Sequence, residues 1–257
     1  MSQLHPAQAA VNAYWKARRD AEEAKANAGR ADTGKRGAVT AGQHLVELEA
    51  IVINEFINAG VDPKDIRQKS GIQLPGYYRP AKKWDVVVIE EDVLVAAIEF
   101  KSQVGPSFGN NVNNRTEEAL GSAADVWRAY QEGTFGAVRP WLGYFFILEE
   151  TRKSTEPVGL PRGMPFPPEE AFAGTSYKDR YRILCERMVR ERLYDAACFL
   201  TATDEAISVI HEPDPELGFA SFAAAIAGRV AGIHAQREAR YPYILGSDGL
   251  DASQPRV

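Results

Sequence analysis

The sequence predicts an α/β fold, in which a mixed central β-sheet of about five strands has helices on both faces. Segments with the apolar spacing of amphipathic helices alternate along the chain with short apolar runs that have the length of buried strands. Two of these runs, 84–90 and 93–102, are separated by a short acidic turn. So short a connection predicts an antiparallel hairpin within the sheet.

The N-terminal part is expected to be helical. Residues 6–28 place alanine, valine and aromatic side chains on one side of a helix, and residues 43–59 repeat the pattern with leucine, isoleucine and phenylalanine. Between them lies the Gly-rich basic segment 29–42. Its composition predicts either an extended segment that becomes ordered on a nucleic acid or a flexible linker.

After residue 60 the spacing of apolar residues changes from that of helices to that of strands. Residues 67–74 predict a weak strand, and the run LPGYYRPAKK that follows is rich in turn, aromatic and basic residues. The hairpin comes next, and residues 103–114, rich in Gly, Pro and Asn, are expected to be irregular. Asn114 with Glu117 three positions later predicts the N-cap of a helix over 115–131.

The C-terminal half supplies the rest of the layers. Residues 141–150 are a strongly apolar run that predicts a central strand, and a Pro-rich connection follows it. A basic amphipathic helix is expected over 177–194, then a strand pair over 197–203 and 206–210. The small-residue segment 219–240 predicts a helix that packs closely on the sheet.

Composition excludes several classes of protein. No apolar run approaches the roughly 20 residues that span a bilayer, and the N-terminus lacks the apolar core of a signal peptide. Cys185 and Cys198 are the only cysteines, which argues against a zinc site and fits a reducing, bacterial-type cytoplasm. The net charge of −5 argues mildly against a nucleic-acid partner, although 64–83 and 177–193 are locally basic.

The hairpin carries an unusual set of charges. Glu99 and Lys101 interrupt an apolar strand and, being two residues apart, share one face of it. Pairing about the turn places Asp85, at the start of the first strand, opposite residues 97–99. Two carboxylates that converge repel each other unless a cation lies between them, and hard oxygen ligands suit Mg²⁺. Two acids, a lysine and Mg²⁺ are the parts needed to hydrolyse a phosphodiester.

Other interpretations of these three residues remain open. They could form a surface ion pair on the hairpin of a DNA-binding protein that has no catalytic activity. A lysine Schiff-base enzyme is disfavoured, because the neighbouring carboxylates favour the charged, non-nucleophilic form of Lys101. The scattered histidines lack a nucleophile partner, and no P-loop is present.

The pattern of Asp85, Glu99 and Lys101 resembles the PD-(D/E)xK nuclease motif, although Trp84 stands where that motif has proline. The runs LPGYYRPAKKWDVVV, VAAIEFKSQVGPSFGNNVNNRTEEALGSAADVW and PWLGYFFILEE, from about Leu74 to Glu150, resemble the XhoI-type restriction endonucleases. The resemblance implies a restriction-endonuclease-like core at about 43–210 of one domain over 1–257. The segment at about 1–41 would be a helical addition.

The resemblance also implies an activity. It is that of a type II restriction endonuclease that cuts double-stranded DNA at the palindrome CTCGAG after the first C, with Mg²⁺, and leaves 5′ overhangs with 5′-phosphates. Asp85, Glu99 and Lys101 take the catalytic places, and the main-chain carbonyl of Phe100 joins Asp85 and Glu99 as a metal ligand. A palindrome cut on both strands implies a homodimer. A cognate DNA methyltransferase would protect the host. A different nuclease on the same fold, acting in repair or on branched DNA, is the alternative.

Residues around the hairpin are candidates for DNA contacts. Asparagine can bind adenine and arginine can bind guanine through two hydrogen bonds to a base edge. The base-reading candidates are Asn110, Asn111, Asn113, Asn114 and Arg115. The phosphate-binding candidates, which precede the first hairpin strand, are Tyr78, Arg79, Lys82 and Lys83, with Tyr77 beside them. In the Gly-rich segment the candidates are Arg30, Lys35 and Arg36. Glu47, Glu49 and Glu118 are helical acids that could join the metal site, although solvated helix faces explain them as well.

Overall fold

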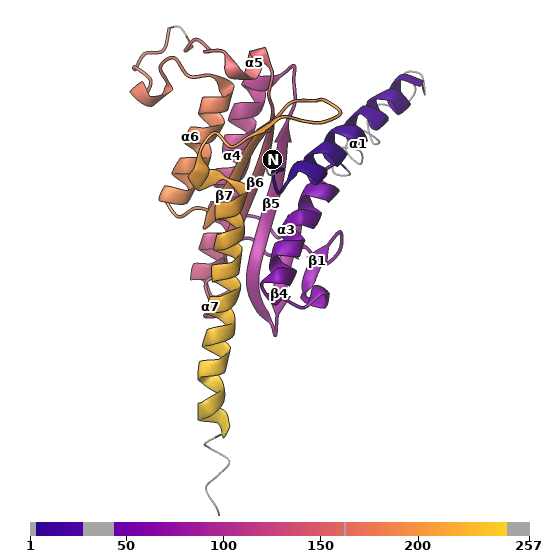
Figure 1. Ribbon diagram of the computed structural model, residues 1–257. Helices are drawn as coiled ribbons and strands as arrows, with labels where there is room; N and C mark the ends of the chain where they lie inside the picture. Colours follow the sequence, from indigo (N-terminus) through magenta and orange to yellow (C-terminus); the bar gives the residue numbers. More distant parts are fainter. Residues whose placement is uncertain (1–3, 28–43, 162, 246–257) are drawn as a thin grey trace, which may run out of the picture.

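The computed structural model describes residues 4–27, 44–161 and 163–245. Its centre is a mixed six-stranded sheet (Figure 1). In spatial order the strands are β1 (Ile66–Gln68), β4 (Val86–Glu90), β5 (Val93–Gln103), β6 (Leu142–Glu149), β7 (Ala196–Ala202) and β8 (Ile210–His211). The β5–β6 and β6–β7 pairs are parallel and the others antiparallel. A separate ribbon pairs β2 (Gln73–Leu74) with β3 (Lys82–Lys83).

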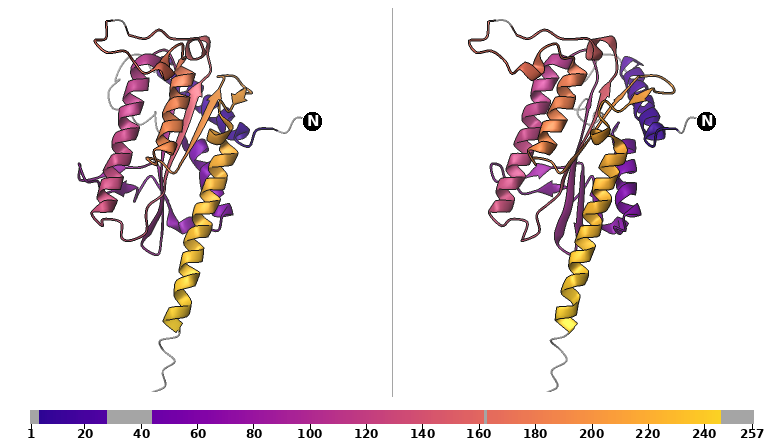
Figure 2. Two further views of the ribbon diagram at one scale, coloured as in Figure 1. Left: turned by 90° about the vertical axis from the view of Figure 1, so that its left-hand side faces the viewer. Right: turned by 60° about the vertical axis from the view of Figure 1, so that its left-hand side comes forward.

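Helices cover both faces of the sheet (Figures 1 and 2). One face packs against α1 (Gln8–Asn27), α3 (Val46–Asn58) and α7 (Phe219–Leu245), and the other against α4 (Phe108–Gln131) and α6 (Tyr177–Arg190). The short helix α5 (Arg152–Thr155) and 3₁₀ turns at Pro63–Asp65, Glu170–Phe172 and Pro215–Leu217 lie in the connections. The predicted α/β architecture is therefore confirmed, with six strands in place of about five.

The strand pattern divides the core into two apolar clusters. Val86, Val88 and Ile98 point toward α3 and α7, whereas Val87 and Ala97 point toward α4 and α6. This division follows from the two-residue period of a strand, which sends successive side chains to opposite faces. Both clusters are buried, because β4 to β7 carry nearly continuous apolar runs rather than an alternation with polar residues.

The prediction for residues 103–114 is wrong over most of its length. Strand β5 continues to Gln103, and helix α4 begins at Phe108, with Ser107 rather than Asn114 at its N-cap. Phe108 is 3% exposed and stacks on the ring of Tyr177, with ring centroids 5.8 Å apart. This tertiary contact extends the helix through a Gly- and Asn-rich segment whose local propensity favours a loop.

The other differences are smaller. The predicted strand 67–74 is two short strands, β1 and β2, which belong to different sheets. The predicted strand 206–210 starts only at Ile210, and the helix predicted over 177–194 ends at Arg190. The Gly-rich segment with Arg30, Lys35 and Arg36 lies outside the described residues. None of the described helices has the length and apolar character needed to cross a membrane.

Candidate active site

The open end of the β4–β5 hairpin brings Asp85 and Glu99 to facing positions. Val86 pairs with Ile98, so the next residues outward are Asp85 and Glu99, and the Asp85 amide donates to the Ile98 carbonyl at 3.2 Å. On the N-terminal side of Asp85 the chain is no longer paired with β5. Asp85 Oδ2 instead accepts the amide of Phe100 at 2.8 Å. The predicted juxtaposition of these two acids is therefore present in the structure.

The same geometry orients the peptide of Phe100. The N–H and C=O groups of one residue leave a strand on the same edge. Because the Phe100 amide faces Asp85, its carbonyl also faces the edge that β4 has left. This position fits the predicted role of the Phe100 carbonyl as an oxygen donor beside Asp85.

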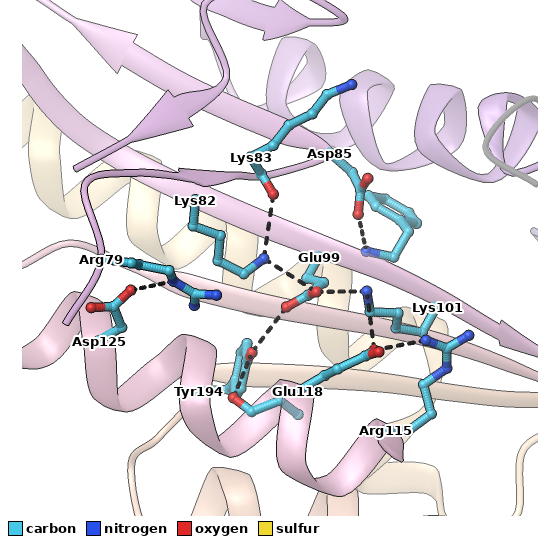
Figure 3. A network of polar contacts seen from close by, with 12 residues as sticks. Arg79, Lys82, Lys83, Asp85, Glu99, Lys101, Arg115, Glu118, Asp125 and Tyr194 are labelled. Carbon is cyan, nitrogen blue, oxygen red and sulfur yellow. Dashed lines mark hydrogen bonds and ion pairs between the residues drawn. The ribbon is translucent and has the colours of Figure 1, made fainter. Parts of the chain in front are cut away.

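Glu99 is the centre of a buried ionic network (Figure 3). The residue is 3% exposed, and its Oε1 lies 2.7 Å from Lys101 Nζ and 3.2 Å from Lys82 Nζ. The Tyr194 hydroxyl lies 3.4 Å from Oε2. Burial alone would raise the pKa of Glu99, but the ammonium groups of Lys82 and Lys101 outweigh that effect and lower it. Glu99 is therefore a charged carboxylate at neutral pH.

Asp85 and Glu49 have the opposite electrostatic character. Burial raises the pKa of Asp85, and the charge of Glu99 adds to the rise, while the Phe100 amide and Lys101 oppose it. Burial, followed by the charge of Asp85, raises the pKa of Glu49 to about 7. Glu49 lies on α3 and accepts a hydrogen bond from the Gln68 side chain at 3.3 Å. Asp85 thus interacts with two acids: the charge of Glu99 raises the pKa of Asp85, and the charge of Asp85 raises the pKa of Glu49.

The three helical acids that the sequence singled out have different surroundings. Glu49 is the one coupled to Asp85, and Glu47 on the same helix is exposed. Glu118 lies 3.5 Å from Lys101 Nζ and 2.7 Å from Arg115 Nη1. The helical period places Glu49 one position after the buried Leu48, at the edge of the packed face. That edge position is the sequence signal that favours Glu49 over Glu47.

The donor set suits a hard divalent cation. Among the described residues, no three His, Cys, Asp or Glu side chains converge into a preformed metal cage. Mg²⁺, however, is commonly held by one or two carboxylates together with water and substrate phosphate, not by an all-protein cage. Asp85, the Phe100 carbonyl and Glu99 provide such a partial set, with Glu49 beside it. A cation there would also relieve the repulsion between the acids, which adds to burial in raising the pKa of Asp85 and of Glu49.

A cleft of about 530 Å³ lies beside this network, with Lys82, Lys101 and Glu118 among its lining residues. Lys82 is a phosphate-binding candidate by its sequence position, but its ammonium group pairs with Glu99 and lies 4.2 Å from the centre of the Trp84 ring. Burial lowers the pKa of Lys82, and the charge of Glu99 opposes that shift. Among the other phosphate-binding candidates, Tyr78, Arg79 and Lys83 also line the cleft.

The base-reading candidates lie on the first turns of α4 rather than on a loop. Asn110, Asn113 and Asn114 are exposed, whereas Asn111 and Arg115 are half-buried. Asn111, Arg115 and Glu118 are spaced by four and three residues, so they lie on one side of α4. Glu118 on that side approaches Lys101. The exposed asparagines form a neighbouring line of the same helix. Arg115 adjoins the cleft through its ion pair with Glu118, whereas Asn110 and Asn113 line two other hollows of the surface.

Comparison with known proteins gives a consistent result. A family model described as restriction endonuclease XhoI matches residues 24–211. The type II restriction enzyme BstVI of Geobacillus stearothermophilus is 44% identical over 177 residues, which cover 66% of this chain and 78% of BstVI. XhoI of Xanthomonas vasicola is 38% identical over 182 residues, or 70% of this chain and 72% of that enzyme. AbrI of Azospirillum brasilense is 44% identical over 152 residues, or 58% and 68%. No solved structure matched the chain.

Proposed function

This chain belongs to the XhoI family of type II restriction endonucleases, which are site-specific deoxyribonucleases, and from that premise we propose its substrate and its catalytic residues. The substrate is double-stranded DNA that contains CTCGAG. The enzyme hydrolyses the phosphodiester after the first C of each strand and leaves 5′ overhangs with 5′-phosphates. Mg²⁺ is the cofactor.

One observation carries the assignment of the catalytic residues. Asp85 and Glu99 face each other where β4 leaves β5, and Lys101 shares the face of Glu99, 2.7 Å from its carboxylate. Asp85, Glu99 and the Phe100 carbonyl would hold Mg²⁺, and Glu49 would bind directly or through a water. When bound, the cation lowers the pKa of a water and neutralises charge on the phosphate.

Lys101 has the central position for the chemistry of the chain itself. Its ammonium group lies between Glu99 and Glu118, 2.7 and 3.5 Å from their carboxylate oxygens. In this position it orients the attacking water and stabilises negative charge as the oxygen–phosphorus bond forms and the bond to the 3′ oxygen breaks. The attacking water loses a proton to solvent, the 3′ oxygen leaves with a proton from solvent, and the phosphate remains on the 5′ end.

The first turns of α4 supply the proposed base contacts. Asn110, Asn113 and Asn114 are exposed and Asn111 is half-buried, while Arg115 pairs with Glu118, which also approaches Lys101. Tyr78, Arg79 and Lys83 line the cleft and would contact the backbone, whereas Lys82 reaches the phosphate only by leaving Glu99. Two copies of the chain, one for each strand, would act as a symmetric dimer on the palindrome. A methyltransferase that modifies the same site would protect the host.

A plasmid digest tests this function. A plasmid with one CTCGAG site and a plasmid with one changed base in that site are incubated with wild-type protein and Mg²⁺. We expect the first to be linearised and the second to stay intact, and we expect Lys101→Ala to cut neither. Cutting of both plasmids would instead indicate a nuclease of another specificity. Binding without cutting would indicate a DNA-binding protein without catalytic activity.

A further inference from the structure

A short loop beside the cleft is held in place by a single carboxylate. The loop Gly76–Arg79, here called the arm, is the middle of the connection between β2 and β3. Asp125 on α4 accepts the backbone amides of Tyr77 and Tyr78 through Oδ1, at 2.7 and 2.8 Å. Its Oδ2 accepts Arg79 Nε at 2.6 Å (Figure 3). Three donors on consecutive residues of the arm therefore converge on one side chain.

This anchor is built closely around the carboxylate. The Asp125 side chain is 3% exposed, and a Cβ atom at Gly76 would lie 2.4 Å from Asp125 Oδ2. Burial would raise the pKa of Asp125, but the hydrogen bonds from Tyr78, Arg79 and Tyr77 outweigh it and lower the pKa. Asp125 is thus a fixed negative charge, and position 76 tolerates no larger side chain without movement of the arm or of the Asp125 carboxylate.

The arm presents its large side chains to solvent. Tyr77 is 47% exposed and Tyr78 73%, and their rings meet edge to face at 4.9 Å. The Arg128 guanidinium lies 4.9 Å from the centre of the Tyr77 ring and supports it. Because these rings bury little surface, the anchor adds little to the core. A rigid loop with exposed aromatic and cationic groups is instead the kind of surface that binds a ligand.

Arg79 connects the arm to the proposed catalytic centre. Its Nε is bound to Asp125, while its terminal nitrogens have no hydrogen-bond partner among the described residues. The guanidinium lines the same cleft as Lys82, Glu99 and Lys101. A guanidinium whose orientation is fixed by Nε offers its outer edge to an acceptor such as a phosphate oxygen.

We propose that Asp125 is a positioning residue that fixes the arm so that Arg79 binds the DNA phosphate next to the one hydrolysed, with Tyr78 packed against the adjoining backbone. The inference rests on the proposed function. It adds a buried acid that never touches DNA yet determines how strongly DNA is held.

The sign of the charge change gives a discriminating test. Asp125→Asn removes a negative charge beside the cleft, so general electrostatics predicts tighter binding of DNA. The proposal predicts weaker binding, because the amide loses the charge that holds the Arg79 guanidinium. Gly76→Ala should weaken binding in the same way without any change of charge, since the added methyl group forces the arm and the Asp125 carboxylate apart.

The experiment measures the affinity of the full chain for a short duplex with one CTCGAG site, in Ca²⁺, from about 50 to 200 mM salt. Arg79→Ala should lower the slope of log affinity against log salt by about 0.9, the value for one phosphate contact. Asp125→Asn and Gly76→Ala should lower the slope similarly and weaken binding about tenfold at low salt. The double variant Asp125→Asn with Arg79→Ala should bind no more weakly than Arg79→Ala alone.

Arg152→Ala is the matched control, because it removes one cation from an exposed pair with Glu156 on α5 and should keep the wild-type slope. Binding by Asp125→Asn that equals or exceeds wild type, or an unchanged slope in Arg79→Ala, would overturn the inference. If Asp125→Asn does not fold, Gly76→Ala and Arg79→Ala decide the question. Wild-type protein that neither binds nor cuts the duplex would contradict the proposed function instead.

Discussion

The two ends of the β4–β5 hairpin both bury a glutamate that is paired with basic side chains, but the open end also holds further, half-buried acids beside it. At the turn, Glu90 is 5% exposed, and α7 supplies its partners. His234 Nε2 lies 3.3 Å and Arg237 Nη1 3.4 Å from its carboxylate oxygens, and Arg237 also donates to the Glu90 carbonyl at 2.9 Å. The acid at this end is balanced by groups that tie the hairpin to a helix.

At the open end, acids face other acids. Glu99 is neutralised by Lys82 and Lys101, but Asp85 lies between Glu99 and Glu49, and its own pKa and that of Glu49 are raised. An arrangement that favours protonation in the free protein costs stability, and a cation would remove that cost. A buried acid that has only basic partners among the described residues, such as Glu90, therefore indicates a structural role. Further acids nearby, as Asp85 lies beside Glu99 and Glu49 beside Asp85, indicate a site for a cation.

The largest predicted effect is a loss of DNA cleavage when an acid at the open end of the hairpin, but not the one at the turn, is replaced. Asp85→Asn keeps an acceptor for the Phe100 amide but removes the charge that would bind the cation. We expect cleavage of CTCGAG under single-turnover conditions to fall by about 10³-fold or more. Glu90→Gln, the control at the turn, should cut at a rate close to wild type. A large loss in Glu90→Gln, or near-normal cutting by Asp85→Asn, would break the comparison.

The next prediction concerns pH. The pKa of Glu49 is about 7, and a protonated carboxyl must lose its proton before it can hold a cation. Cleavage at limiting Mg²⁺ should therefore rise as pH increases through about 7, and excess Mg²⁺ should move that rise to lower pH. Glu49→Gln should raise the Mg²⁺ concentration needed for half-maximal cleavage by about 10–100-fold. It should also remove the rise in cleavage through about pH 7. A profile identical to wild type would exclude Glu49 from the site.

For the free energy of unfolding, we expect a substitution at the turn to matter more than one at the open end. Glu90→Gln removes the charge that satisfies His234 and Arg237, which should lower the free energy of unfolding by about 1–3 kcal/mol. Denaturant titration of the metal-free protein measures this value. Glu91→Gln is the matched control, because Glu91 is exposed and approaches Arg237 only at 3.7 Å. Equal stability of the two variants would contradict a structural role for Glu90.

The smallest predicted effect is a gain in stability at the open end. The pKa of Glu49 is raised in the folded state, so its contribution to stability is present below its unfolded value and is lost as pH rises through about 7. Glu49→Gln should therefore stabilise the metal-free protein above pH 7, by about 1 kcal/mol after solvent screening of this half-buried group. Melting curves at pH 5 and pH 8 should show the gain only at pH 8. Equal changes at both pH values would contradict this assignment.

The sequence predicted the hairpin and its facing acids because both depend on local rules. A two-residue period and a short turn determine which residues of two antiparallel strands are opposite each other, so Asp85 and Glu99 could be placed together. The layers of helices followed from amphipathic spacing in the same way. In these regions local propensity and tertiary packing favour the same structure.

The sequence could not predict contacts between distant elements. The start of α4 depends on the stacking of Phe108 on Tyr177, which lie on different helices. Asp125 had no signal of its own, since its donors belong to a loop that precedes it by more than 40 residues. Helical spacing gives the face on which Glu49 lies, but only the fold shows that Asp85 is across from it.

The most direct test of the account is a calorimetric titration of Mn²⁺ into the full chain at pH 8, with wild type, Asp85→Asn and Glu90→Gln compared. The account predicts that wild type and Glu90→Gln bind the ion with similar affinity and that Asp85→Asn loses this binding. Wild type should also bind more weakly at pH 6, where Glu49 is protonated. Binding by Asp85→Asn equal to that of wild type would show that the open end of the hairpin is not the cation site.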